Sequence, residues 1–117
     1  EPISPMVAHG EDHWRDIAFW VFNALIAAEE HGITQANVDQ MRSSSNNPEV
    51  QRILGVTGKF AAKLKLSESW AYDAIKGVGN YGEIWDRHLG PNTKIGANRG
   101  LNNLWTNGGL MISPPFR

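Results

Sequence analysis

The sequence predicts an all-α fold: a compact bundle of about five or six mostly short helices, with an extended N-terminal connector and a proline-rich tail. Residues 11–31 carry a long apolar stretch at helical spacing, and helix-capping signals recur through the rest of the chain. The only candidate strand is residues 110–113. The 117 residues suffice for one modest core, so we expect a single helical domain over residues 1–117.

The first part of this domain is expected to be an extended connector over residues 1–9, because its prolines remove backbone donors and disfavour helix. A long apolar helix is expected over residues 10–32. Acidic side chains at its start favour the positive end of a helix, and Gly32 suits a left-handed cap at its end.

Short helices and the tail are expected over residues 33–117. We assign the starts of these helices from Ser, Thr and Asn caps, and their ends from Gly and Pro. The expected helices run from Thr34 to about Arg42, from the Asn47 cap with Pro48 at the first position, over Lys59–Leu64, from the Ser67 cap to the glycines at 77–79, from Asn80 towards Leu89, and over Ala97–Asn107.

Composition excludes several classes of protein. The formal net charge is −1 and the basic residues are scattered, so no nucleic-acid-binding surface is predicted. The absence of cysteine excludes a disulfide scaffold and thiol chemistry. The longest apolar run, residues 17–28, is broken by Asn23, whereas a bilayer span needs about 20 residues. No membrane insertion is therefore predicted.

The long helix is apolar on more than one side, which predicts burial on several sides. Its apolar residues are Trp14, Ile17, Val21, Leu25 and Ala28 in one stripe, Phe19, Phe22 and Ile26 in a second, and Trp20 beside them. The remaining short helices are too small to cover all of this surface. We therefore predict that the chain associates with itself, by exchange of this helix between protomers. The predicted association surface is Trp14, Phe19, Trp20, Phe22 and Ile26. The alternative is a central helix that the others wrap completely.

Residues 77–82 satisfy the G-x-G-x-x-G pattern of dinucleotide-binding sites. Such a site needs a preceding strand, and here a helical pattern precedes the glycines. We interpret them instead as a break at which two helices approach each other, with Trp70, Tyr81 and Trp85 filling the space. No cofactor is predicted.

Two histidines, His9 and His13, have the spacing of a metal-binding pair, but no third ligand is evident. No metal site is predicted. His31 and His88 are expected at the C-terminal ends of helices, where a positive charge complements the helix dipole.

Paired carboxylates do not indicate catalysis in this sequence. Glu29 and Glu30 are adjacent on a helix and point apart, whereas hydrolysis of a glycoside requires two carboxyl groups across a cleft. Glu83, which also lies near Asp86, is expected to pair with Arg87 on the surface. No catalytic residue is predicted.

The proline-rich tail is expected to dock onto the bundle through Leu110, Ile112 and Phe116. A frayed terminus and a polyproline recognition segment are the alternatives.

Five sequence blocks occur in one order: residues 1–34 (EPISPMVAHGEDHWRDIAFWVFNALIAAEEHGIT), 47–55 (NPEVQRILG), 70–90 (WAYDAIKGVGNYGEIWDRHLG), 99–105 (RGLNNLW) and 108–117 (GGLMISPPFR). In this order they resemble the C-terminal portion of the general L-amino-acid-binding periplasmic proteins of ABC importers, the family 3 solute-binding proteins. The resemblance spans the whole chain.

This resemblance implies that the chain is a fragment of an α/β protein whose two lobes close on an L-amino acid and whose closed form is presented to a membrane permease. The groups that hold the ligand lie in earlier segments of such proteins, so no ligand-binding residue is assigned. We expect a periplasmic, structural, non-enzymatic role without ligand binding by this chain alone. The alternative is a free-standing helical interaction module that associates through residues 11–31. An enzyme is a third alternative, and no residue spacing supports it.

Overall fold

A computed structural model describes residues 4–117, which form six α-helices and two short 3-10 helices. The α-helices are α1 (Asp12–Glu30), α2 (Val38–Ser44), α3 (Pro48–Ile53), α4 (Phe60–Leu64), α5 (Trp70–Val78) and α6 (Tyr81–His88). The 3-10 helices are η1 (Gly100–Asn102) and η2 (Trp105–Asn107). The prediction of an all-α fold with a proline-rich tail is confirmed. Glu1 and Pro2, at the start of the predicted connector, lie outside the described residues.

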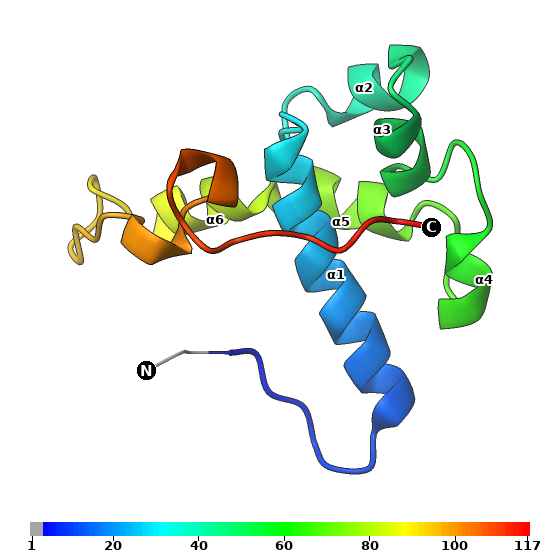
Figure 1. Ribbon diagram of the computed structural model, residues 1–117, viewed down its shortest axis with the longest axis horizontal. Coiled ribbons are helices and arrows are strands. Elements are labelled where there is room, and N and C mark those ends of the chain that lie inside the picture. The colour runs from blue at the N-terminus through cyan, green and yellow to red at the C-terminus, as the bar shows by residue number, and fades with distance from the viewer. Residues whose placement is uncertain (1–3) are drawn as a thin grey trace.

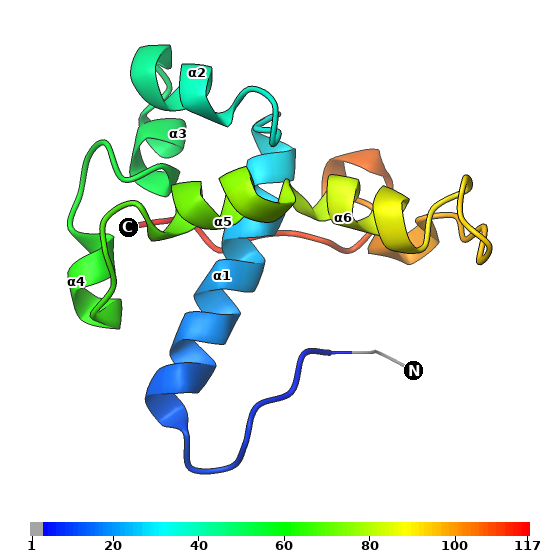
Figure 2. The ribbon, with the colours of Figure 1, turned by 180° about the vertical axis from the view of Figure 1, so that it is seen from behind.

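Helix α1 lies between two layers. The C-terminal tail crosses one side of α1 (Figure 1), and α5 crosses the opposite side, with α6 continuing beyond it (Figure 2). Helices α2 and α3 lie near the C-terminal end of α1, whereas its N-terminal half projects away from the bundle. As a result, residues 23–28 of α1 are buried, whereas residues 12–16 at its start are exposed.

The hydrophobic core forms where the C-terminal half of α1 meets α2, α3 and α5. Its buried members are Ala24, Leu25, Ala27, Ala28, Ile33, Val38, Val50, Ile53, Leu54, Ala71, Ile75 and Phe116. Burying one large aliphatic side chain of this kind stabilises a fold by about 1.5–3 kcal/mol. Because these contacts gather around one half of α1, that half organises the packing of the short helices.

Aromatic rings attach the tail to the bundle. Phe116 is only 3% exposed, and its ring centroid lies 5.3 Å from that of Trp20, 5.5 Å from Phe60 and 6.2 Å from Trp70. Such aromatic contacts add about 0.5–1.5 kcal/mol per pair to the burial of the ring itself. Docking of the tail through Phe116 thus agrees with the sequence analysis.

The rest of the tail is held by polar contacts. The side chains of Leu110 and Ile112 are 69% and 58% exposed, so the prediction that they also dock on the bundle is wrong. Instead, the backbone N–H of Ser113 donates to Glu30 Oε1 at 3.1 Å. A backbone contact of this kind has no side-chain pattern that a sequence could reveal.

The break between α5 and α6 is fixed by a capping box. Asn80 Oδ1 accepts a hydrogen bond from the backbone N–H of Glu83 at 2.9 Å, and Glu83 Oε2 accepts one from the N–H of Asn80 at 2.8 Å. The buried Asn80 amide also donates to the carbonyl of Ile33 at 2.8 Å. Gly79, with φ of +81°, ends α5. The predicted break and restart are therefore confirmed.

Two short helices begin later than predicted. Thr34 and Asn37 exchange hydrogen bonds between side chain and backbone at 2.7 and 3.1 Å, which forms a turn before α2 begins at Val38. Helix α5 begins at Trp70, so the predicted Ser67 cap is wrong. Asn47 does cap α3 as predicted, since its side chain accepts from the N–H of Glu49.

The helix predicted over residues 97–107 is wrong. This segment forms η1 and η2 instead, because Gly100 adopts a φ of +50° that interrupts a right-handed helix. Within the described part of the chain, the predicted strand at 110–113 is reduced to one isolated bridge between Leu104 and Met111.

An ion pair fastens this irregular segment to the bundle. Arg99 donates to Glu29 through two nitrogens at 2.8 and 3.1 Å, and both side chains are 16% exposed. The guanidinium carbon of Arg99 also lies 5.2 Å from the ring centroid of Tyr81 and 5.9 Å from that of Trp85. A Cβ at Gly82 would approach Glu29 Oε1 to 2.7 Å and Arg99 Nη1 to 3.0 Å, so a methyl group there would displace the pair.

We expect Gly82→Ala to lower the free energy of unfolding by about 1–3 kcal/mol, because the added methyl group displaces the Glu29–Arg99 pair. Urea unfolding followed by circular dichroism measures this change. Gly77→Ala is the matched control in the same G-x-G-x-x-G segment, since its Cβ would meet no atom within 4 Å. It should stabilise α5 by at most about 1 kcal/mol. Equal effects of the two substitutions would contradict the packing described for Gly82.

Candidate functional site

The five residues of the predicted association surface lie at different depths. Trp14 and Phe19 are 56% and 51% exposed, and Trp20 and Phe22 are half-buried. Ile26 is only 2% exposed and lies inside the bundle. Ile26 therefore takes no part in an exposed surface, and the exposed apolar residues belong to the N-terminal half of α1.

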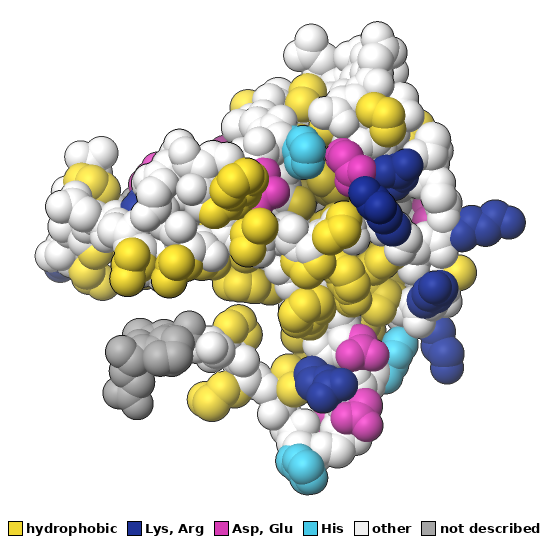
Figure 3. All heavy atoms as spheres, in the orientation of Figure 1, with side chains coloured by type: hydrophobic (Ala, Val, Ile, Leu, Met, Phe, Trp, Pro, Cys, Tyr) yellow, Lys and Arg dark blue, Asp and Glu magenta, His cyan; other side chains and the backbone are white. Residues whose placement is uncertain are grey.

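An apolar groove of about 230 Å³ lies between this half of α1 and the connector. Its apolar lining residues are Pro5, Val7, Ala18, Phe19 and Phe22. Met6, which follows Pro5, is 93% exposed. Figure 3 shows hydrophobic side chains on the connector and on the neighbouring face of the bundle. We call Met6, Trp14, Phe19, Phe22 and this groove the α1–connector surface.

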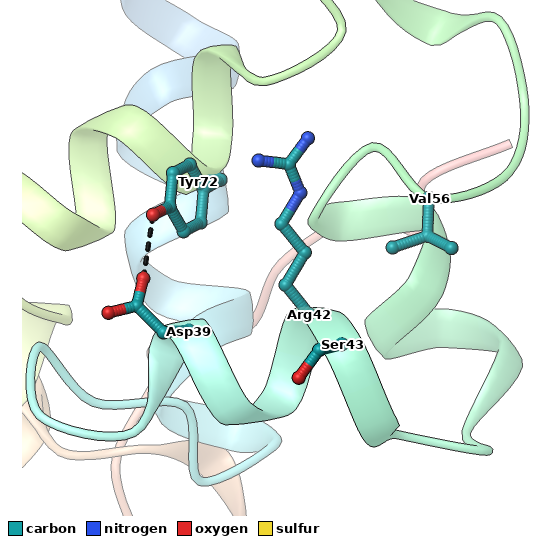
Figure 4. A pocket seen from close by; sticks show the side chains of 5 residues that line it. All are labelled: Asp39, Arg42, Ser43, Val56 and Tyr72. Carbon is teal, nitrogen blue, oxygen red and sulfur yellow. Dashed lines mark hydrogen bonds between the residues drawn. The ribbon is translucent and has the colours of Figure 1, made fainter.

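A second, polar site lies between α2, α5 and the segment after α3 (Figure 4). Its cavity of about 440 Å³ is lined by Asp39, Arg42, Ser43, Val56 and Tyr72, and we call it the Arg42 pocket. The Tyr72 hydroxyl donates to Asp39 Oδ1 at 2.6 Å, and the Lys76 ammonium group binds Asp39 Oδ2. The Arg42 guanidinium carbon lies 4.5 Å from the centroid of the Tyr72 ring.

The hydrogen bonds within this cluster shift the pKa values of Asp39, Tyr72 and Lys76. The hydrogen bond from Lys76, followed by that from Tyr72, lowers the pKa of Asp39 from its ordinary 3.8. The hydrogen bond to Asp39 raises the pKa of Tyr72 above 10.0 and that of Lys76 above 10.5. The carboxylate is therefore held ionised between two donors.

The sequence analysis singled out none of the residues of the Arg42 pocket. Asp39 and Arg42 are three residues apart on α2, and Tyr72 and Lys76 are four apart on α5, so each pair shares one helix face. This spacing indicates that each pair lies on one face of its helix, but it does not indicate that these two helix faces pack against each other. Only the packing of α2 against α5 joins the two pairs.

The glycine-rich motif at 77–82 begins in the last turn of α5 and ends in the first turn of α6, so a helix rather than a strand precedes it, as the sequence pattern indicated. Tyr81 and Trp85 lie beside it, with ring centroids 6.5 Å apart. Trp70 instead lies at the other end of α5 against Phe60 and Phe116, so its predicted place in the break is wrong.

The carboxylates considered for catalysis have structural partners. Glu29 binds Arg99, and Glu30 accepts from the backbone of Ser113, so the two adjacent side chains point apart. The predicted Glu83–Arg87 ion pair is wrong: Glu83 Oε2 accepts the backbone N–H groups of Asn80 and Gln35, and Arg87 donates to the carbonyl of Val78 at 3.0 Å.

The histidines considered as ligands are separated by the start of α1. His9 lies in the connector, and His13 lies in the first turn of the helix. His31 follows the end of α1 and His88 ends α6, in the positions expected for them. Among residues 4–117, no three His, Asp or Glu side chains gather closely enough to hold a metal ion.

The two tyrosines provide a spectroscopic test of the cluster. We expect Asp39→Ala to move the pKa of Tyr72 back towards 10.0, because the substitution removes the hydrogen-bond acceptor. The pKa of Tyr81 should stay raised, because burial is its main cause. Titration of the absorbance near 295 nm measures both, and Tyr72→Phe isolates the signal of Tyr81.

The sign of the pH effect follows from the raised pKa of Tyr72. Its contribution to stability is present below pH 10.0 and is lost as the pH rises through the folded-state pKa. A Tyr72 pKa that does not respond to Asp39→Ala would contradict the hydrogen bond.

No family model matches the chain. The chain is 50% identical over 117 residues to the glutamate/glutamine/aspartate/asparagine-binding protein BztA of Rhodobacter capsulatus. It is 50% identical over 119 residues to the general L-amino acid-binding periplasmic protein AapJ of Rhizobium johnstonii, and 43% identical over 117 residues to the putative amino-acid ABC transporter-binding protein YhdW of Escherichia coli. Each match covers the whole of this chain but only 35%, 35% and 34% of the relative, respectively.

A solved structure of a periplasmic binding protein is also similar to this chain. The ABC transporter periplasmic binding protein from Brucella ovis with glutathione bound is 45% identical, with a TM-score of 0.89 over 95% of this chain and 35% of that protein. None of the helices in residues 4–117 is both long and apolar enough to cross a bilayer. These matches do not support the alternative of a free-standing interaction module. The chain belongs to the amino-acid-binding periplasmic proteins of ABC transporters and represents a C-terminal portion of such a protein.

Proposed function

We propose that this chain is the C-terminal structural part of a periplasmic amino-acid-binding protein that serves an ABC importer. The observation that carries the proposal is the identity of 50% to BztA across the whole chain. In the complete protein, an L-amino acid and a membrane permease are the partners. The chain itself contributes no catalysis and braces the lobe to which it belongs.

The α1–connector surface supports a bracing role. Trp14 and Phe19 are each about half exposed on the N-terminal half of α1, and Phe19 also lines the mainly apolar groove. Large apolar side chains gathered on one surface mark a contact with another protein surface. Pro5 and Val7 of the connector line this groove together with Phe22, so the connector and this half of α1 form one continuous surface (Figure 1).

The same geometry supports the proposal that the chain does not bind an amino acid alone. An amino acid carries a carboxylate and an ammonium group, and both need buried charged or polar partners. The groove on α1 is mainly apolar, and the Asp39 carboxylate in the Arg42 pocket is already bound by Lys76 and Tyr72. The ligand-holding groups are therefore assigned to the other two-thirds of the complete protein.

A chimera tests this function. In the chimera, this chain replaces the matched 117 residues of BztA. We expect the purified chimera to bind L-glutamate in calorimetric titration, as unmodified BztA should, whereas this chain alone gives no heat with any L-amino acid. A folded chimera without affinity, or amino-acid binding by the chain alone, would contradict the proposal. Circular dichroism checks that both proteins are folded.

We also propose that the chain, when isolated, associates with itself through the α1–connector surface. Trp14→Gln should shift the mass measured by light scattering towards the monomer, because it removes an apolar anchor from this surface. Trp105→Gln is the matched control, since Trp14 and Trp105 are 56% and 55% exposed but lie on different elements. A monomeric parent chain, or equal effects of the two substitutions, would contradict association through α1.

A further inference from the structure

The Arg42 pocket holds a cationic group that the rest of the described chain does not neutralise. No carboxylate in residues 4–117 lies within ion-pairing distance of Arg42, whereas Arg52, Lys76 and Arg99 each have such a partner. Asp39 lines the same pocket, but its two oxygens are engaged by Tyr72 and Lys76. Figure 4 shows the Arg42 side chain extended from α2 between Tyr72 and Val56.

The environment of Arg42 prepares its guanidinium for an anion. Its stacking against the Tyr72 ring, 4.5 Å from the centroid, restricts the side chain and thereby reduces the entropy that binding would cost. A planar guanidinium donates two parallel hydrogen bonds to one carboxylate. Because Lys76 balances the charge of Asp39, the single remaining positive charge of Arg42 matches a singly charged carboxylate better than a doubly charged phosphate.

The shape of the pocket indicates how the carboxylate is presented. Small-molecule sites usually bury about 70–90% of their ligand. The Arg42 pocket is instead open to solvent, and one wall is the apolar side chain of Val56, which is 47% exposed. A carboxylate on a peptide segment satisfies both features, since its apolar neighbours can rest on Val56 while its own backbone stays at the surface.

We propose that the Arg42 pocket is a docking site for an Asp or Glu side chain carried by an apolar segment of a partner protein. The pocket and the α1–connector surface lie near opposite ends of α1 (Figures 1 and 2). Both surfaces can therefore be occupied at the same time. The proposal goes beyond the function assigned above, because it adds a second contact and does not depend on amino-acid binding.

The test uses the full chain and the peptide acetyl-Gly-Leu-Glu-Leu-Gly-amide as the probe. Two-dimensional NMR should show saturable shifts of the Arg42 side-chain N–H and the Val56 methyl signals, with a Kd of about 1 mM or tighter. The same peptide with Gln in place of Glu should bind at least about tenfold more weakly, because it lacks the charge. Increasing the salt concentration should weaken binding of the Glu peptide.

Substitutions locate the binding group. Arg42→Gln should weaken binding by at least about tenfold, and Arg42→Lys should weaken it less, because it keeps the charge but loses the paired donors. Lys63→Gln, at an exposed residue of α4, removes the same charge elsewhere and should leave the affinity unchanged. The one-dimensional spectrum of each variant verifies its fold.

Three outcomes would overturn the proposal: no shift at Arg42 or Val56, equal binding of the Glu and Gln peptides, or equal losses in Arg42→Gln and Lys63→Gln. Free L-glutamate that binds as tightly as the peptide would overturn docking of a protein segment and would identify a small-molecule site instead. None of these measurements involves the chimera, so failure of the proposed function and failure of this proposal are distinguishable.

Discussion

Helix α1 carries large apolar side chains along its whole length, whereas the short helices and the tail surround only its C-terminal half. Residues 23–28 are buried between α5–α6 on one side and the tail on the other. The first two turns have no comparable cover, which leaves Trp14 and Phe19 half-exposed. This unequal burial organises the molecule: one half of α1 builds the core, and the other half lines an apolar groove with the connector.

The arrangement around the buried half depends on a few polar contacts that hold irregular backbone in place. Asn80 ties the break between α5 and α6 to the carbonyl of Ile33, just beyond the end of α1. The Glu29–Arg99 pair ties the segment after α6 to the last turn of α1. Each contact joins residues that are distant in sequence, and each satisfies buried polar groups whose isolation would be costly. The short helices thus keep their positions although none is long enough to be stable alone.

The sequence predicted the regular parts of this fold because their signals are local. Asn47 and Asn80 cap helices at the expected positions, and the glycine at 79 ends α5. It failed over residues 97–107, where apolar and amide residues mimic a helix but Gly100 requires a positive φ. The rest of that segment depends on Arg99 and Glu29, seventy residues apart, and no local pattern reports such a contact.

The candidate sites show the same division. Periodicity identified α1 as too apolar for a surface helix, but it could not tell that Ile26 lies in the covered half and Phe19 in the exposed half. The burial of each depends on where α5, α6 and the tail cross α1. The Arg42 pocket was missed altogether, because α2 and α5 contribute ordinary helix-surface residues that acquire a role only when Tyr72 meets Asp39.

The positions of the two surfaces constrain how the complete protein is built. The proposed bracing surface lies where the exposed half of α1 meets the connector. The Arg42 pocket lies near the C-terminal end of α1, where α2 and α3 contribute buried residues to the core. The α1–connector surface and the Arg42 pocket share no residues, so occupation of one does not block the other. The length of α1 thus separates the two proposed contact surfaces, and its buried half fixes their relative positions.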